Sequence, residues 1–120
     1  LYNSAIMCVF VNPTAPVLAK LLSEATGWSS DIVWWQRTGE RIFNLKRAFN
    51  NRLGVRRGND RLPERLSIPK TNGSRGRTPR REMLLTDYYA HREWDWETGR
   101  PKRDKLISLG LAEIAEELWS

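Results

Sequence analysis

The sequence has 120 residues and a formal net charge of +6, which is enough chain for one domain with a modest core. It contains no run of about 20 apolar residues that would cross a bilayer and no basic-then-apolar leader with a cleavage site. We therefore expect a soluble, cytoplasmic protein with no membrane partner. A single cysteine excludes an internal disulfide and a closed zinc or iron–sulfur site supplied by this chain alone.

The positive charge raises a nucleic-acid hypothesis, because clustered Lys and Arg release counterions when they neutralise phosphates. Much of the excess lies in residues 54–65 and 73–81, which are rich in Gly, Pro, Asn and Ser, whereas acidic residues gather at 93–97 and 113–117. Charge runs of this kind are usually solvated or dock on a neighbour. The distribution therefore disfavours a nucleic-acid partner.

Helical periodicity runs along the whole chain, with no sustained two-residue alternation, so we predict an all-α fold. Residues 1–11 are expected to be the end of a buried helix, and the apolar run so close to Leu1 indicates a chain cut inside an element. A second helix is predicted over residues 15–26, with Gly27 as its left-handed cap. Its apolar residues share one face: Val17, Leu18, Leu21, Leu22 and Ala25.

A long helix is predicted to end at Gly54, with Ser29 or Ser30 as its cap and Asp31 favourable to its dipole. Gly39 costs roughly 1 kcal/mol relative to Ala inside a helix, so we expect a close backbone approach there. The three-to-four spacing predicts one buried stripe, formed by Trp35, Gly39, Ile42, Leu45, Phe49 and Leu53. Glu40 lies within one turn of Arg37 and Asn44, its predicted partners.

Residues 55–78 lack an apolar stripe, so we predict a long irregular loop, and loops of this length usually are functional or wrap another surface. We favour wrapping. Thr78-Pro79 is predicted to start a helix whose inner face carries Leu84, Tyr88 and His91. Residues 94–101 form a predicted turn, and residues 104–109 a short helix. Gly110 precedes a last helix with a buried side of Leu111, Ile114, Ala115 and Leu118.

Few residues indicate chemistry on their own. There is no Gly-rich phosphate loop, no His/Cys cluster and no Ser–His–Asp set. The only histidine, His91, is more readily explained as a packed side chain with Asp87 as its partner than as a catalytic base. The six tryptophans could stack bases, but core packing explains them better. For Cys8, composition alone favours an inert buried thiol.

Taken together, residues 24–66 and 83–111 resemble one family. The pieces occur in that family's order: A-T-G-W, G-E-R-I, R-x-F-N, D-x-L-P-E-R, Y-Y, W-D, G-x-P and K-L-x-x-L-G-L. The opening "NSAIMCVF" is similar to the family segment D-S-x-x-x-C-x-F. The chain thus resembles the carboxy-terminal helical domain of the tungsten-dependent aldehyde ferredoxin oxidoreductases. The match covers nearly all of residues 1–120, which we expect to be one domain and a fragment of a longer chain.

The resemblance implies a specific role. Such enzymes hold tungsten between two pterin dithiolenes beside a 4Fe-4S cluster, oxidise aldehydes to acids and pass electrons to ferredoxin. It implies that Cys8 is the fourth cluster ligand, the other three coming from an earlier domain, and that Asn3 and the Met7 backbone lie against a pterin. The catalytic residues would lie in upstream domains of the same enzyme, a possible homodimer. The metal could also be molybdenum, and the isolated chain is expected to be inactive and free of cofactors.

Two departures and two alternatives accompany this interpretation. Asn3 replaces an aspartate, which removes a negative charge from the pterin site, and Glu93 replaces the glycine of R-G-W-D, so the turn before Trp94 is expected to shift. The chain could instead be a metal-free stand-alone interaction module with the same fold. It could also be a basic helical nucleic-acid-binding domain using the arginines of the loop and its borders, Arg56, Arg57, Arg75, Arg77, Arg80 and Arg81.

Overall fold

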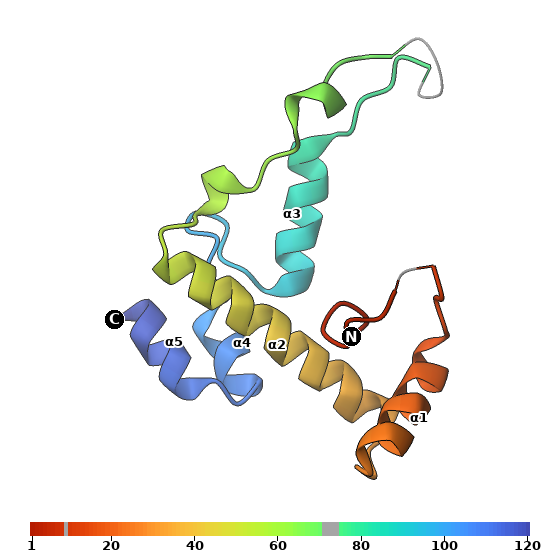
Figure 1. Ribbon diagram of the computed structural model, residues 1–120. Coiled ribbons are helices and arrows are strands. Elements are labelled where there is room, and N and C mark those ends of the chain that lie inside the picture. The colour runs from red at the N-terminus through yellow and green to blue at the C-terminus, as the bar shows by residue number, and fades with distance from the viewer. Residues whose placement is uncertain (9, 71–74) are drawn as a thin grey trace.

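The computed structural model describes residues 1–8, 10–70 and 75–120, and in these residues it contains helices and no β-strand (Figure 1). The all-α prediction is confirmed. The α-helices are α1 (Ala15–Thr26), α2 (Ile32–Arg52), α3 (Arg81–Arg92), α4 (Arg103–Ser108) and α5 (Ala112–Trp119). Two short 3-10 turns, η1 (Arg57–Asn59) and η2 (Glu64–Leu66), interrupt the predicted loop between α2 and α3.

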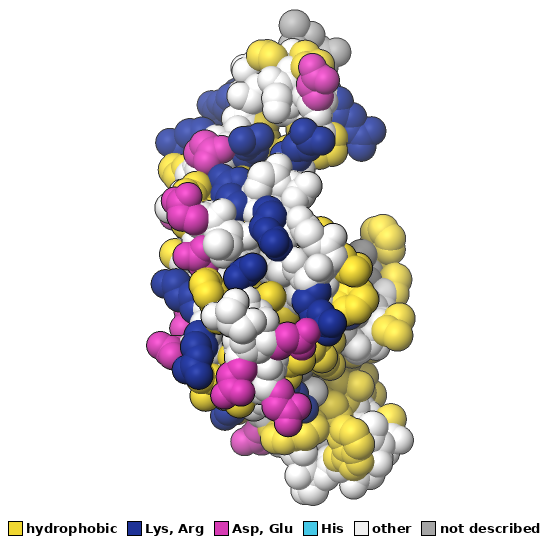
Figure 2. Space-filling view, turned by 90° about the vertical axis from the view of Figure 1, so that its left-hand side faces the viewer, with side chains coloured by type: hydrophobic (Ala, Val, Ile, Leu, Met, Phe, Trp, Pro, Cys, Tyr) yellow, Lys and Arg dark blue, Asp and Glu magenta, His cyan; other side chains and the backbone are white. Residues whose placement is uncertain are grey.

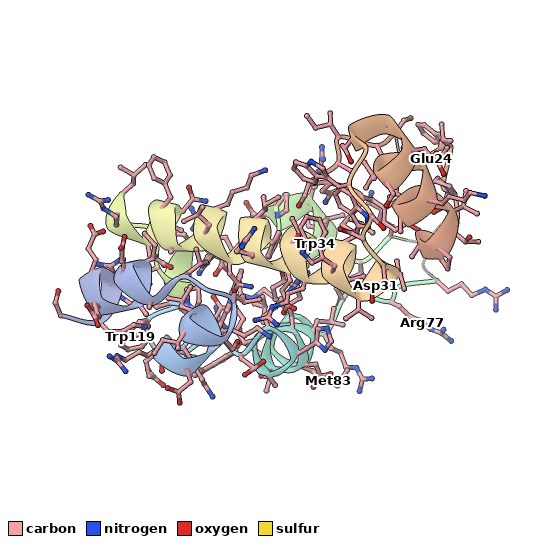
Figure 3. The ribbon with its side chains drawn as sticks, turned by 90° about the horizontal axis from the view of Figure 1, so that it is seen from below. Glu24, Asp31, Trp34, Arg77, Met83 and Trp119 are labelled. Carbon is pink, nitrogen blue, oxygen red and sulfur yellow. The ribbon has the colours of Figure 1, made fainter. Side chains whose placement is uncertain are left out.

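Helix α2 is the central element, with α1 beside its amino end and α5 beside its carboxyl half (Figure 1). Asp31, rather than the predicted Ser29 or Ser30, caps it by accepting a 2.8 Å hydrogen bond from the Trp34 amide. Figure 3 shows Asp31 and Trp34 together at this end. The Trp28 and Trp35 rings stack there at 5.9 Å between centroids, and the Trp35 indole N–H donates a 3.0 Å hydrogen bond to the Ser23 hydroxyl of α1. The core packing predicted for the tryptophans therefore holds for Trp35, which is buried, but not for Trp28, which is exposed.

A small aliphatic core lies between α2 and the α4–α5 hairpin. Ala48, Leu106, Ala115 and Leu118 are buried, and Leu111 and Ile114 pack against them. The predicted buried side of the last helix is therefore confirmed. Gly110, at a φ of 74°, makes the tight turn between α4 and α5, a conformation that glycine adopts without a side-chain penalty.

The predicted apolar stripe of α2 is only half correct. Trp35 and Gly39 are buried, whereas Leu45, Phe49 and Leu53 are exposed. In the carboxyl half the buried residues include Asn44, Arg47 and Asn51, which share a face because their spacing is three and four. The helix turns this polar face toward α3 and residues 94–101, where hydrogen bonds compensate its burial. The exposed apolar residues are consequently left on another face.

Helix α3 also differs from its prediction. It begins at Arg81 rather than at Thr78-Pro79, and the predicted inner residues Leu84, Tyr88 and His91 are exposed. Its one buried residue is Tyr89. Consecutive residues of a helix differ by a rotation of about 100°, so Tyr89 lies on a different face from the predicted Tyr88. The contacts of Tyr89 near the carboxyl end of α3 determine that its face is the buried one.

The molecule is extended for its length. Its radius of gyration is 17.5 Å, against roughly 14 Å for a compact domain of 120 residues. The loop after α2 runs away from the helices together with the amino end of α3 (Figure 1). Hydrophobic side chains gather on the surface in the space-filling view (Figure 2). No helix in the described part of the chain is long and apolar enough to cross a membrane.

Candidate functional site

The amino-terminal segment, residues 1–8, contains the three predicted site residues and is not the buried helix that the sequence predicts. It forms turns, with amide-to-carbonyl hydrogen bonds from Ala5 to Leu1 (3.0 Å) and from Met7 to Tyr2 (3.1 Å). A helix in this segment would need a continuous apolar face to bury. Ile6, at a φ of 55°, lies instead in the left-handed region, which interrupts helical geometry.

Three contacts anchor this segment to the helices. The Tyr2 hydroxyl donates a 2.6 Å hydrogen bond to the Pro13 carbonyl, and the Ser4 hydroxyl donates a 3.4 Å bond to the Gly39 carbonyl on α2. A Cβ built on Gly39 would lie 2.8 Å from the Leu1 Cα and 2.9 Å from its amide nitrogen. The predicted close backbone approach at Gly39 is therefore confirmed, and Leu1 is the backbone that approaches.

The three site residues differ in exposure. Cys8 is exposed, contrary to the buried thiol that composition alone favours. Asn3 is also exposed and Met7 is half-buried. Next to Cys8, Ile6 and Phe10 are 92% and 94% exposed. Large apolar side chains this open usually belong to a surface that another protein part covers.

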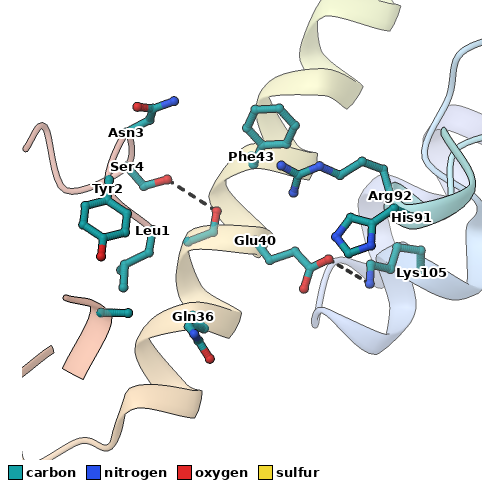
Figure 4. Close-up of a pocket in the computed structure, with 12 residues that line it drawn as sticks. Leu1, Tyr2, Asn3, Ser4, Gln36, Glu40, Phe43, His91, Arg92 and Lys105 are labelled. Carbon is teal, nitrogen blue, oxygen red and sulfur yellow. Dashed lines mark hydrogen bonds and ion pairs between the residues drawn. The ribbon is translucent and has the colours of Figure 1, made fainter. Parts of the chain in front are cut away.

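Asn3 lines a cavity of about 770 Å³ between the amino-terminal segment, α2, the end of α3 and α4 (Figure 4). Met7 and Cys8 are not among its lining residues, so the structure brings only one of the three predicted residues to this cavity. On the far wall, Lys105 forms ion pairs with Glu40 at 2.9 Å and Glu93 at 2.7 Å. The Glu40 carboxylate thus pairs with Lys105 of α4 rather than with the predicted Arg37, whereas the Glu40 backbone carbonyl accepts a 3.0 Å hydrogen bond from the predicted partner Asn44.

The cationic groups of this wall have structural partners. Burial alone would lower the pKa of Lys105, but hydrogen bonds to Glu93 and Glu40 raise it above its ordinary value. The Arg92 guanidinium carbon lies 4.3 Å from the centre of the Phe43 ring, within cation–π range. His91, exposed beside them, shows no catalytic geometry. These contacts explain the polar wall as an interhelical connection.

Glu93, which stands where we expect the family pattern to have glycine, takes a backbone conformation that favours glycine. Its φ of 55° places it in the left-handed region at the carboxyl cap of α3. The turn that follows is intact: Trp94 bridges Pro101, and the Asp95 amide donates a 2.7 Å hydrogen bond to the Arg100 carbonyl. Glu93 thus precedes a closed turn in a conformation that glycine adopts without a side-chain penalty, and the shift relative to the family pattern stays a prediction.

A buried polar network, formed by Arg47, Asn51, Asp60, Tyr89 and Gly99, lies on the other side of α2. The Arg47 guanidinium donates to both carboxylate oxygens of Asp60, at 2.9 and 2.6 Å, and to the Gly99 carbonyl at 2.7 Å. The Tyr89 hydroxyl donates to Asp60 and accepts a 3.1 Å bond from Arg47. One guanidinium thereby joins α2, the loop, α3 and the turn at residues 94–101.

The network shifts two pKa values in opposite directions. Burial would raise the pKa of Asp60, but the hydrogen bonds from Arg47 and Tyr89 outweigh it and hold that pKa below its usual range. Burial and the hydrogen bond to Asp60 raise the pKa of Tyr89 to about 12. Asp60 is therefore a carboxylate, and Tyr89 a neutral phenol, at physiological pH.

Four of the five network residues, all except Asn51, belong to the sequence pieces that carry the resemblance. Arg47 begins R-x-F-N, Asp60 begins D-x-L-P-E-R, Tyr89 ends Y-Y and Gly99 begins G-x-P. Periodicity missed them because it assigns Arg47 to a solvated face. A sequence signal for this network is that one piece contains an arginine, Arg47, and another contains an aspartate, Asp60, which could form an ion pair. These pieces thus connect four segments of the fold through one network.

No group of three or more His, Cys, Asp and Glu side chains that could hold a metal occurs within residues 1–8, 10–70 and 75–120. The arginines of the nucleic-acid alternative are partly engaged. Arg57 pairs with Glu82 at 2.9 Å and lies 4.1 Å from the Trp96 ring centre. Arg56 donates to the Asn51 carbonyl at 2.7 Å. Both therefore serve the fold.

The structure is thus an all-α domain with a buried polar network on one side of α2. Its anchored amino-terminal segment carries an exposed cysteine. The family model described as aldehyde ferredoxin oxidoreductase, domains 2 and 3, matches residues 1–111. The chain therefore belongs to the aldehyde ferredoxin oxidoreductase family, and the predicted resemblance is confirmed.

Curated relatives carry the same description. The chain is 36% identical over 119 residues to the tungsten-containing aldehyde ferredoxin oxidoreductase of Pyrococcus furiosus, covering 95% of this chain and 20% of that protein. It is 35% identical over 119 residues to that of Thermococcus kodakarensis, with the same shares. For Pyrococcus horikoshii the identity is 34% over 117 residues, covering 93% and 19%. The chain spans about a fifth of the length of these relatives.

Proposed function

We propose that residues 1–120 are the carboxy-terminal domain of a tungsten-pterin, or molybdenum-pterin, enzyme that oxidises aldehydes to carboxylic acids and reduces ferredoxin. Family membership and the names of the relatives support this function. The aldehyde pocket and the catalytic residues would come from upstream domains of the same enzyme. A cytoplasmic location and a homodimer of the complete enzyme belong to the same proposal.

The observation that carries the proposal is the exposure of Cys8. A free cysteine is ordinarily among the most buried residues, yet this thiol is exposed, beside Ile6 and Phe10. A 4Fe-4S cluster is held by four cysteine thiolates. This chain can supply one, and the donor type fits, so Cys8 would complete a ligand set whose other three members come from an upstream domain. When bound, such a cluster carries single electrons between the active site and an acceptor.

Asn3 and Met7 would contact the pterin. The Asn3 amide is exposed and can both donate and accept hydrogen bonds, which suits a pterin edge that carries donors and acceptors. The Met7 amide already donates to the Tyr2 carbonyl at 3.1 Å, so its own carbonyl would be the group offered to the pterin. The anchors at Tyr2, Ser4 and Gly39 would hold both residues in position.

The test is Cys8→Ala in the natural full-length enzyme. We expect loss or conversion of the cluster and failure of electron transfer to ferredoxin, with the fold kept because the thiol is exposed. Iron content, the electron paramagnetic resonance signal of the reduced cluster and circular dichroism measure these effects. Thr14→Ala, an exposed substitution at a helix cap without a side-chain hydrogen bond, is the control. Unchanged iron content and turnover in Cys8→Ala would refute the ligand assignment.

An intact mass of the native protein, with tungsten, molybdenum and iron measured on the same anaerobic sample, tests the proposal as a whole. A much longer polypeptide with one tungsten or molybdenum and about four irons is expected. A metal-free polypeptide of 14.0 kDa would instead identify a stand-alone interaction module.

A further inference from the structure

A second open surface lies on the loop side of the molecule, far along the chain from Cys8. We define the basic arm as the described residues 61–70 and 75–84. Figure 2 shows Lys and Arg side chains gathered over the upper part of the molecule, where this arm lies. The arm contains seven Lys and Arg residues but only two carboxylates, Glu64 and Glu82, so its charge is strongly positive.

Of the three carboxylates in or next to the arm, Asp60 and Glu82 are already used, which leaves Glu64 alone to face the arginines of the arm. Asp60 is bound by Arg47 and Tyr89, and Glu82 is bound by Arg57 at 2.9 Å and Arg81 at 2.8 Å. Neither is free to neutralise the remaining arginines. Within the described part of the chain, no hydrogen bond or ion pair involves the side chains of Arg61, Arg65, Arg77 or Arg80. Figure 3 shows Arg77 at the edge of the molecule.

The arm also holds two aliphatic hollows. The first, about 470 Å³, lies between the arm and the rest of α3 and has an apolar lining of Leu62, Leu84, Leu85 and Tyr88. Its charged lining is Arg61, Arg81 and Asp60, the last of which is already bound by Arg47. The second, about 440 Å³, is lined by Leu66, Ile68, Arg65 and Arg77 together with Lys70, Thr78 and Pro79. Both hollows combine apolar side chains with neighbouring arginines. The surface can therefore bind apolar groups in the hollows and anionic groups beside them.

The chemistry of the floors distinguishes between partners. Single-stranded nucleic acids bind where aromatic side chains stack the bases and cations follow the phosphates. The hollows here are mostly aliphatic, and a phosphate backbone has no side chains to fill them. A polypeptide with apolar side chains and carboxylates matches both the floors and the charge.

We propose that the basic arm docks an acidic polypeptide segment, which places apolar side chains in the two hollows and carboxylates beside Arg61, Arg65 and Arg77. The surface around which this loop was predicted to wrap would then be an acidic polypeptide. This docking does not depend on Cys8 or on a cluster, so it stands or falls separately from the proposed enzymatic function.

The experiment uses the natural full-length protein and, as probe, a short fluorescein-labelled peptide in which leucines are separated by pairs of glutamates. The test variant is Arg65→Glu with Arg77→Glu. The matched control is Lys20→Glu with Arg103→Glu, because both residues are exposed and lie outside the arm. Fluorescence anisotropy should show affinity at least about tenfold weaker in the test variant, since like charges are brought together, and changed less than about twofold in the control.

The apolar contribution is tested by Ile68→Ser, which should weaken the same peptide several-fold, and by a peptide with serine for leucine, which should bind poorly to the unaltered protein. Equal binding of a peptide with glutamine for glutamate would overturn the proposal. So would tighter binding of a duplex DNA oligomer with a steep salt dependence. Absence of peptide binding, with the amides of residues 61–68 protected from hydrogen exchange, would show that upstream domains cover the arm and would also overturn it.

Discussion

The polar network beside the carboxyl half of α2 and the amino-terminal segment beside its first half differ in how their side chains are buried. On the polar face of the carboxyl half, Arg47 and Tyr89 are buried and bonded within the chain, so these polar groups find their partners in the same domain. At the amino end, Ile6, Cys8 and Phe10 are open. The first region therefore maintains the fold, whereas the second presents an exposed thiol and apolar side chains, which upstream domains would cover under the proposed function.

The largest expected effect comes from breaking the buried network. Arg47→Ala would leave the Asp60 carboxylate without its bidentate partner and should lower the free energy of unfolding by about 3–5 kcal/mol. Urea unfolding followed by tryptophan fluorescence measures the change. Arg52→Ala is the control, because Arg52 pairs with Glu117 while both side chains are about half exposed, and such pairs contribute about 0–1 kcal/mol. Similar losses in both variants would contradict the structural role of the network.

A smaller effect should appear at high pH. The pKa of Tyr89 is about 12 in the folded protein and about 10 in an unfolded chain. Because the folded state holds the proton more tightly, its contribution to stability is complete below pH 10 and disappears as the pH rises toward 12.

The control for this pH effect is Tyr89→Phe, which removes the titrating hydroxyl but leaves every Lys and Arg. Unfolding free energies of the two proteins are compared at intervals from pH 9 to pH 12. The unaltered protein should lose stability more steeply than the variant. Parallel curves would mean that the phenol ionises alike in the folded and unfolded states.

The sequence predicted the elements whose burial depends on apolar spacing better than those whose burial depends on polar contacts. The α1 boundaries were correct because Gly27 ends that helix in the left-handed conformation, although Val17 and Leu21 of its predicted apolar face are about half exposed. The buried side of α5 was correct because regular apolar spacing determines which side of a short helix is buried. The faces of α2 and α3 were partly wrong, since buried Asn44, Arg47 and Tyr89 are selected by hydrogen bonds between distant segments, which periodicity does not detect. The helix predicted for residues 1–11, of which residue 9 lies outside the described residues, was wrong: Ile6 has a left-handed φ of 55°, and Ile6 and Phe10 are exposed rather than packed on one buried face.

The smallest expected change in stability, and the sharpest local one, comes from Gly39→Ala. Alanine favours the helix by roughly 1 kcal/mol, but its Cβ would lie within 3 Å of the Leu1 backbone. We therefore expect a net change in unfolding free energy of less than about 1 kcal/mol, with faster hydrogen exchange at residues 2–8 and lower iron content in the full-length enzyme. Gly58→Ala, where a Cβ meets nothing within 4 Å, should change neither. Unaltered exchange and iron in Gly39→Ala would mean that the contact with α2 does not position Cys8, even if Cys8 itself proves to be a ligand.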